Sequence, residues 1–287
     1  MNRKGYVLSA VILAADMLFP FGGWLLAAAA AAYAFGFGEA LGRRGMGAIP
    51  CDPALGQKHR KLQECFDRVC AKIEAAGEED SSRLRSIGIY YIPTQKINAY
   101  TFGRSTIGIT DGTLNLDSRT IEALIAHEIG HILRGDAVLH MVLAVHTLGI
   151  TAMLSLWQFA FVAIIWLIVG IGCLCGTMRF TYLSHMLTTK LAAGIRWIGQ
   201  LIQNGVLAGC QAVIRRIGRK GELLADQYAC SLGYGLYLRS FLTRFSQTQA
   251  QRTYWDVLYA THPISAERIA RIDQMLQQDF RSSAEIL

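Results

Sequence analysis

The chain contains few charged residues for its length. Of its 287 residues, 17% are Asp, Glu, Lys or Arg and 52% are hydrophobic, whereas about a quarter of a typical soluble domain is charged. Charge is scarcest in two regions. The single charged residue in Tyr6–Gly38 is Asp16, and Ala137–Met178 contains no Asp, Glu, Lys or Arg. This distribution argues against an ordinary soluble domain and predicts membrane-embedded segments.

Paired cysteine motifs and nucleic-acid-binding motifs are also lacking. The seven cysteines are odd in number and form no C-x-x-C spacing, which fits a reducing cytoplasm rather than a disulfide framework. The net charge is +7, but the Lys and Arg residues are dispersed and several flank the apolar regions. Such flanks face the cytoplasm. We therefore expect a bilayer and no nucleic acid as a partner, in an integral protein of the bacterial inner membrane.

The first apolar region is too long for a single straight span. One helix over Tyr6–Gly38 would measure about 50 Å, against about 30 Å for the hydrocarbon core. Pro20–Gly23 reads as a break, so we expect a transmembrane hairpin within residues 1–40. The apolar stretch is too long for a cleaved signal peptide.

The second apolar region is long enough for two spans. One arrangement is a transmembrane hairpin over 137–178, with arms near 137–154 and 156–176, followed by an amphipathic surface helix in 179–218. The other arrangement is one long helix within 137–176 and a returning span at 195–214. Both keep the flanking domains, 41–136 and 219–287, on one side of the membrane, and the sequence leaves both open.

The most informative motif is His127–His131, which reads H-E-x-x-H. On a helix, residues i and i+4 share one face, so His127 and His131 can bind one metal ion. Glu128 can then act as general base toward a water on that metal. Zinc with three protein ligands and an open position is a hydrolytic centre. Asp117 or Ser118 can cap the start of this helix.

A second i, i+4 pair can complete the metal site. Glu222 and Asp226 would share one helical face, with Glu222 as the third zinc ligand and Asp226 as acceptor for the ring N–H of a ligating histidine. Asp136, which follows the metal helix, can either belong to this outer shell or cap the next helix. We favour the cap.

These residues resemble the HtpX-like membrane zinc metalloproteases, relatives of the CAAX prenyl protease. The matching blocks, in order, are Asn98–Gly103, Ile109–Gly112, His127–Asp136, Glu222–Asp226 and Thr261–Pro263. The resemblance implies an α-rich α+β membrane protein. Its zincin-type metalloprotease domain would contain a small β-sheet and be interrupted by transmembrane helices. The ordered set is far more specific than any single motif.

Hydrophobic patterning locates the elements of the soluble part. Residues 57–76 read as an amphipathic helix, Ile87–Ile92, Ala99–Phe102 and Thr106–Thr110 read as strands, and Asp111–Gly112 reads as a turn. Further helices are expected near 219–232, 236–250 and 265–279. The metal helix closes the first part of the protease domain (41–136), and the second part (219–287) supplies the third ligand.

The leading hypothesis is a zinc endopeptidase that binds one Zn²⁺ per chain and has its active site in the cytoplasm. The resemblance implies His262 and Arg268 as oxyanion stabilisers and Asn98 as a holder of substrate backbone. It also implies a cleft strand that accepts an extended substrate by β-addition. Polypeptide substrates would be misfolded or unassembled membrane proteins. The alternatives are a helix-capping role for His262 and, for the whole chain, a membrane scaffold or assembly factor with a structural zinc site.

Overall fold

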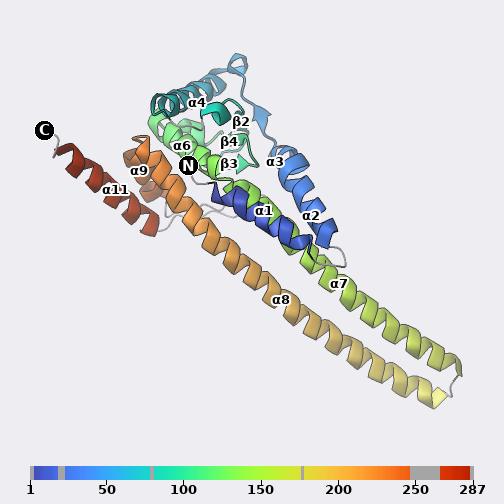
Figure 1. Cartoon of the computed structure of the whole chain (residues 1–287). Coiled ribbons are helices and arrows are strands. Elements are labelled where there is room, and N and C mark those ends of the chain that lie inside the picture. Colours follow the sequence, from blue (N-terminus) through green and yellow to red (C-terminus); the bar gives the residue numbers. More distant parts are fainter. Residues whose placement is uncertain (1–2, 19–22, 78–80, 176–177, 246–265, 285–287) are drawn as a thin grey trace. The chain divides into compact units, whose positions relative to one another are not determined.

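The computed structural model describes residues 3–18, 23–77, 81–175, 178–245 and 266–284 (Figure 1). The chain is rich in helix and contains one small mixed sheet. The helices are α1 Lys4–Asp16, α2 Gly23–Ala31, α3 Gly38–Gly45, α4 Gln57–Ala75, α5 Ser81–Leu84, α6 Ser118–Arg134, α7 Asp136–Cys175, α8 Met178–Ser231, α9 Gly235–Phe245 and α11 Ala266–Ala284. A π-helical segment, Ala32–Phe37, joins α2 to α3, and short 3-10 turns occupy Pro53–Leu55 and Thr113–Asn115.

The sheet has four strands in the order β1-β2-β4-β3. The strands are β1 Ile49–Pro50, β2 Gly88–Ile92, β3 Ala99–Phe102 and β4 Thr106–Thr110. Strands β2 and β4 pair in parallel, and β3 pairs with β4 antiparallel. The strands expected from alternation are confirmed. Strand β3 therefore lies at one edge of the sheet, directly against α6.

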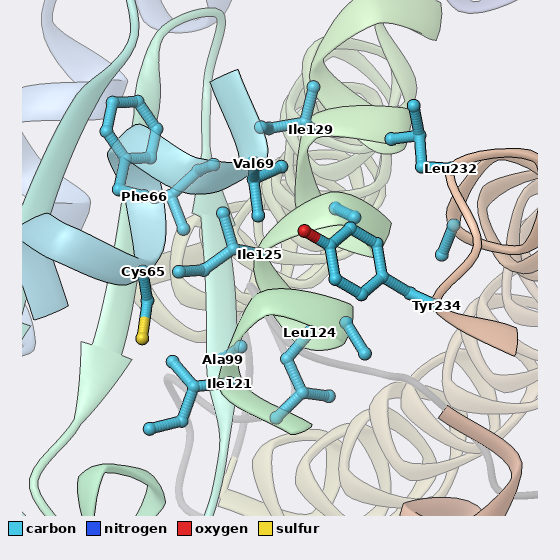
Figure 2. Packing of buried hydrophobic residues seen from close by; sticks show 14 of the residues in the cluster. Cys65, Phe66, Val69, Ala99, Ile121, Leu124, Ile125, Ile129, Leu232 and Tyr234 are labelled. Atoms are coloured by element: carbon cyan, nitrogen blue, oxygen red, sulfur yellow. The ribbon is translucent and has the colours of Figure 1, made fainter. Parts of the chain in front are cut away.

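The main hydrophobic core forms where α4 packs on α6 (Figure 2). The apolar stripe of α4, at the 3–4 residue spacing of a helix face, supplies Leu62, Cys65, Phe66, Val69 and Ile73. The predicted amphipathic helix is thus confirmed. Figure 2 shows Val69 of α4 beside Ile125 and Ile129 of α6, with Ala99 of β3 beside Ile121. Burial of each large apolar side chain here contributes about 1.5–3 kcal/mol to folding stability. This packing holds α6 in place on the sheet.

Helix α6 has clear start and stop signals. Asp117 caps the N-terminus by accepting a hydrogen bond of 2.9 Å from the Thr120 backbone N–H, one of the two predicted caps. Gly135 ends the helix in the left-handed conformation, at φ 76°, which glycine adopts without strain. The helix has no exposed turn from Thr120 to Arg134, so its polar side chains are held inside the fold.

The N-terminal helices α1 and α3 pack against α6 and β3, respectively. Helix α1 ends at Asp16 and α2 begins at Gly23, and the transmembrane hairpin expected within residues 1–40 stays a prediction. Tyr6 donates a hydrogen bond to the Ile132 carbonyl of α6. A Cβ on Gly5 would lie only 2.4 Å from the Gly135 carbonyl oxygen. The glycine at position 5 therefore permits α1 to contact the end of α6 directly.

The carboxylate of Glu39 in α3 anchors the turn between β3 and β4. It accepts hydrogen bonds from the backbone N–H of Arg104 at 3.1 Å and from the Ser105 hydroxyl at 2.9 Å. Gly103 takes φ 60° at this turn, where a side chain would also clash with Glu39. The end of the N-terminal segment is thus tied to the edge strand.

The hairpin expected over 137–178 is wrong in its position, because α7 runs unbroken from Asp136 to Cys175. No proline interrupts this stretch. The polar residues near the expected turn bond within the helix instead. Thr151 donates to the Thr147 carbonyl, and Ser155 donates to the Thr151 carbonyl, which is the i−4 pattern of helical hydroxyls. The alternative agrees with α7 in having one long helix here, whereas its returning span at 195–214 stays a prediction.

The surface helix expected in 179–218 is also not separate. It is continuous with the helix expected at 219–232, and together they form α8. By contact, the chain divides into two compact units, Met1–Leu143 with Arg216–Leu287, and Ala144–Arg215. The boundaries between the units fall inside α7 and α8 rather than in loops.

Within the unit Ala144–Arg215, α7 and α8 lie antiparallel. Gln203 of α8 donates hydrogen bonds to the Thr151 carbonyl and the Ser155 hydroxyl of α7. One turn earlier in α8, Gly199 lies against the side chain of Gln158. Residues earlier in α8 therefore contact residues later in α7, as expected for antiparallel helices. Among the residues that the structure describes, two helical stretches are long and apolar enough to cross a membrane, Leu25–Gly45 and Asp136–Ile171.

Candidate metal centre

Helix α6 carries the two histidines of the H-E-x-x-H motif on one buried face. His127, Glu128 and His131 are 2%, 1% and 6% exposed. The ring nitrogens His127 Nε2 and His131 Nε2 lie 3.2 Å apart, as the i, i+4 spacing predicted. The Glu128 carboxylate is held by the Thr101 hydroxyl of β3, with Oε2 2.5 Å from Oγ1.

Glu222 of α8 completes a group of three potential metal ligands. Its Oε2 lies 3.5 Å from His127 Nε2, and its Oε1 lies 3.3 Å from His131 Nε2. Four ligands arranged tetrahedrally about 2.0–2.1 Å from a zinc ion lie roughly 3.3–3.4 Å from one another. The donor types and their spacings therefore fit zinc, and among the residues that the structure describes the group has three members.

Small residues allow α6 and α8 to approach at this point. A Cβ added to Gly130, between the two histidines, would lie 3.2 Å from the Cα of Ala225. Ala225 lies between Glu222 and Asp226 and is itself fully buried. The two motifs thus meet through their smallest residues, and this close approach brings the acidic pair to the histidines.

Asp226 lies behind His127. Its Oδ1 is 2.9 Å from His127 Nδ1, within reach of the ring N–H, so Nε2 is left as the atom that faces the metal position. Burial alone would raise the pKa of Asp226, but hydrogen bonds and charges from His127 and Arg268 hold that pKa below its ordinary value. This contact supports the predicted role of Asp226 as acceptor for the ring N–H of a ligating histidine, which stays a prediction.

Asp136 takes the equivalent place behind His131. Its Oδ2 lies 3.0 Å from His131 Nδ1 and 3.0 Å from Arg134 Nε. The preference for a simple helix cap at Asp136 therefore overlooked its main contact. The contact is local in the sequence, because Gly135 ends α6 in the left-handed conformation and Asp136 follows His131 by only five residues.

Arg268 of α11 lies between the acidic residues. Its Nη1 is 2.8 Å from Glu222 Oε2, its Nη2 is 2.6 Å from Asp226 Oδ1, and its side chain is almost completely buried. Burial would lower the pKa of the guanidinium, but the charges of Glu222 and Asp226 raise it. Arg268 is therefore placed to hold the acidic pair, a role different from the oxyanion donor implied by the resemblance.

Two further residues were expected at the site. Asn98 immediately precedes β3, and its Oδ1 accepts a hydrogen bond of 3.0 Å from the Ala99 backbone N–H. Its own backbone N–H donates to Thr110 and Thr113, so these contacts fix the start of the edge strand. His262 lies outside the described residues.

The whole arrangement matches a known family. The model of peptidase family M48 matches residues 57–276, which include both motifs and all three candidate ligands. The chain belongs to peptidase family M48. The predicted HtpX-like metalloprotease is thereby confirmed at the level of the family.

Curated relatives of this M48 chain agree with that assignment. A protease HtpX homolog of Acidiphilium cryptum is 27% identical over 245 residues, which are 76% of this chain and 77% of that protein. One from Sulfurovum sp. is 25% identical over 65% of this chain and 68% of its own length. One from Bacillus velezensis is 32% identical over 98 residues, and this match spans 31% of that protein. No solved structure matches the chain.

Proposed function

We propose that this chain is a membrane-integrated zinc endopeptidase. The observation that carries the proposal is the convergence of His127, His131 and Glu222 at tetrahedral spacing, with the Glu128 carboxylate one residue from the first ligand. A structural zinc site is usually closed by four protein ligands, whereas a catalytic site keeps one position open. The Glu128 carboxylate beside the three candidate ligands favours a catalytic centre, because a purely structural site has no use for a base there.

The chain's own residues supply the proton transfers. When bound, zinc would act as a Lewis acid, polarising the scissile carbonyl and lowering the pKa of water to about 7. Glu128 would take a proton from the attacking water and pass it to the leaving amine. Asp226 and Asp136 would keep His127 and His131 in the tautomer that presents Nε2.

The substrate-binding roles follow from the edge strand and the family resemblance. Strand β3 lies at an end of the sheet, so an extended polypeptide can add to it as a further strand. Asn98, at the start of that strand, would hold substrate backbone. His262 would stabilise the oxyanion. Arg268 would act mainly by keeping Glu222 and Asp226 in place.

The apolar helices support location in a membrane. Helix α7 exposes large side chains such as Trp157, Phe159 and Trp166 along its length. If α7 crosses the bilayer, α8 must return, because His131 and Glu222 share one site. The basic flanks favour a cytoplasmic site in a bacterial inner membrane. Misfolded or unassembled membrane proteins are then the substrates that both the site and its location suit.

A comparison of Glu128→Gln with the wild type tests the function. Both full-length proteins, purified in detergent, should bind about one zinc, and only the wild type should cleave unfolded casein. Glu267→Gln, a change to an exposed residue of α11, serves as the control and should cleave normally. Zinc binding without cleavage by the wild type would instead support a scaffold with a structural metal. Equal cleavage by Glu128→Gln would overturn the assignment of the base.

A further inference from the structure

Strand β3 presents its two faces to different surroundings. Ala99 packs in the main core against α4 and α6, whereas Tyr100 and Phe102 pack with Ile92 on the other side of the sheet. Because side chains alternate along a strand, Thr101 shares the face of Ala99 and points toward α6. An edge strand thus directs a hydroxyl at the metal-binding helix.

The Thr101 hydroxyl contacts Glu128 in two ways. Its Oγ1 lies 2.5 Å from Glu128 Oε2 and 3.3 Å from the Glu128 backbone carbonyl oxygen. A hydroxyl has one proton to donate, and the carboxylate is both the nearer and the stronger acceptor. The shorter distance is typical of an O–H···O⁻ bond. Both side chains are buried, at 6% and 1% exposure, so water does not compete for the bond.

We propose that Thr101 is a positioning residue for the general base. Its hydroxyl holds one oxygen of the Glu128 carboxylate, so the side chain keeps a single rotamer beside His127. This inference rests on the proposed peptidase function. It goes beyond that function by connecting the general base to the substrate. Thr101, which holds the base, belongs to β3, the strand on which the substrate is expected to lie.

This link has a consequence for turnover. Thr101 pairs with Ile107 of β4 through the backbone, so its position is fixed by the sheet rather than by a loop. Polypeptide added to the outer edge of β3 would further restrict the strand and, through Thr101, the base. Misplacing a catalytic group by about 1 Å can cost about 10²-fold in rate. Loss of the hydroxyl should therefore lower kcat rather than weaken substrate binding.

Three substitutions separate the hydroxyl from the shape of the side chain. Thr101→Val keeps the shape and removes the donor, Thr101→Ser keeps the donor, and Thr101→Ala removes both. Thr120→Val is the matched control, because Thr120 also donates from its hydroxyl to a carboxylate, that of Asp117, on the same helix as Glu128. Its contact lies at the cap of α6 rather than at the metal centre.

Each full-length variant is assayed for zinc content, melting temperature, kcat and KM with unfolded casein. We expect Thr101→Val to bind one zinc and to lose about 10- to 100-fold in kcat with little change in KM. Thr101→Ser should recover most of the wild-type kcat. Thr120→Val should lower the melting temperature and leave kcat unchanged.

The outcomes distinguish the two levels of the proposal. A wild-type kcat in Thr101→Val, or equal losses in Thr101→Ser and Thr101→Val, overturns the role of the hydroxyl while the peptidase function stands. If Thr101→Val fails to fold, Thr101→Ser and Thr101→Ala decide: equal activity overturns the role, and activity in the serine variant alone supports it. A wild-type protein that binds zinc and cleaves nothing overturns the peptidase function, and this role with it.

Discussion

Arg268 and Asp226 form a two-pronged ion pair inside the protein. Arg268 Nε lies 2.7 Å from Asp226 Oδ2, and Nη2 lies 2.6 Å from Oδ1. The same guanidinium reaches Glu222 through Nη1. Arg268 of α11 therefore connects Glu222, the third candidate ligand, to Asp226, which lies behind His127. The order of the site thus depends largely on this single side chain.

Arg268→Ala should accordingly weaken zinc binding as well as turnover. Removing the guanidinium leaves two buried carboxylates unpaired, which typically costs about 3–5 kcal/mol of folding stability, and outer-shell losses typically cost about 10–100-fold in metal affinity. Zinc titration and denaturant unfolding measure the two effects. Arg239→Ala is the control, because its pair with Asp273 is largely open to water. Wild-type zinc affinity with reduced kcat would restore the oxyanion role.

Glu222→Ala should lose the metal. The two carboxylate oxygens of Glu222 lie 3.5 Å from His127 Nε2 and 3.3 Å from His131 Nε2, respectively. Removal of this side chain leaves two ligands where a zinc site needs at least three. Metal analysis of the purified protein should give about one zinc for the wild type and for Glu267→Ala, and almost none for Glu222→Ala. Full occupancy in Glu222→Ala would mean that another residue is the third ligand.

Asp136→Asn should weaken zinc binding by about 10–100-fold. The neutral amide cannot stabilise the ring of His131 as the carboxylate does, although the size of the side chain is kept. Asp117→Asn is the matched control, because asparagine caps a helix as well as aspartate does. Competition with a chromogenic chelator measures the affinities. Equal affinities for both variants would return Asp136 to the role of a simple cap.

Compartment reporters test the path through the membrane. Reporters at positions 2, 80 and 285 should lie in the cytoplasm, and a reporter at 176, between α7 and α8, should lie on the opposite side. The reason is that a continuous α7 of 40 residues is long enough to cross once, with α8 as the return. A cytoplasmic signal at 176 would contradict this path and place the helix pair on one side.

Acid should destabilise the sheet through Asp111. Hydrogen bonding from Lys58, opposed by burial and assisted by Tyr91 and Gln95, holds the pKa of this carboxyl below its usual range. Because the folded pKa of Asp111 is depressed, its carboxylate stabilises the fold at pH values above the unfolded pKa of about 3.9. This stabilisation is lost as the pH falls through the lower folded pKa. Asp111→Asn should therefore be less stable at pH 7 and lose less stability below about pH 4. Acid titrations of the wild type and of Asp111→Asn, followed by circular dichroism, measure this difference. Identical titration profiles for the two proteins would contradict the assignment.

Local patterns predicted much of the fold because the relevant forces are local. The strands over 99–102 and 106–110 follow from alternation, and α4 and α6 follow from helical periodicity and the Asp117 cap. The position of Glu222 beside the histidines was accessible because two i, i+4 pairs together define a metal geometry. These elements need no knowledge of distant packing.

The sequence was misleading or silent where the role of a residue depends on its packing. The turn expected between 137–154 and 156–176 falls inside α7, where the hydroxyls of Thr151 and Ser155 donate to preceding carbonyls. The partners of Arg268 could not be read from the sequence, because they lie on a helix more than forty residues earlier in the chain. Thr101 carried no signal at all, since a threonine in a strand is ordinary and only the packing of β3 on α6 gives its hydroxyl a partner.

The position of Asp136 also constrains protein engineering. It is the first residue of an apolar helix, yet its carboxylate contacts His131. A water-soluble version of the enzyme made by cutting at the start of that helix would discard a support of the metal site along with the hydrophobic surface. A deletion confined to 144–215, the separate unit, spares that support, so the excision point for crystallisable or secretable fragments lies two turns inside the helix rather than at its beginning.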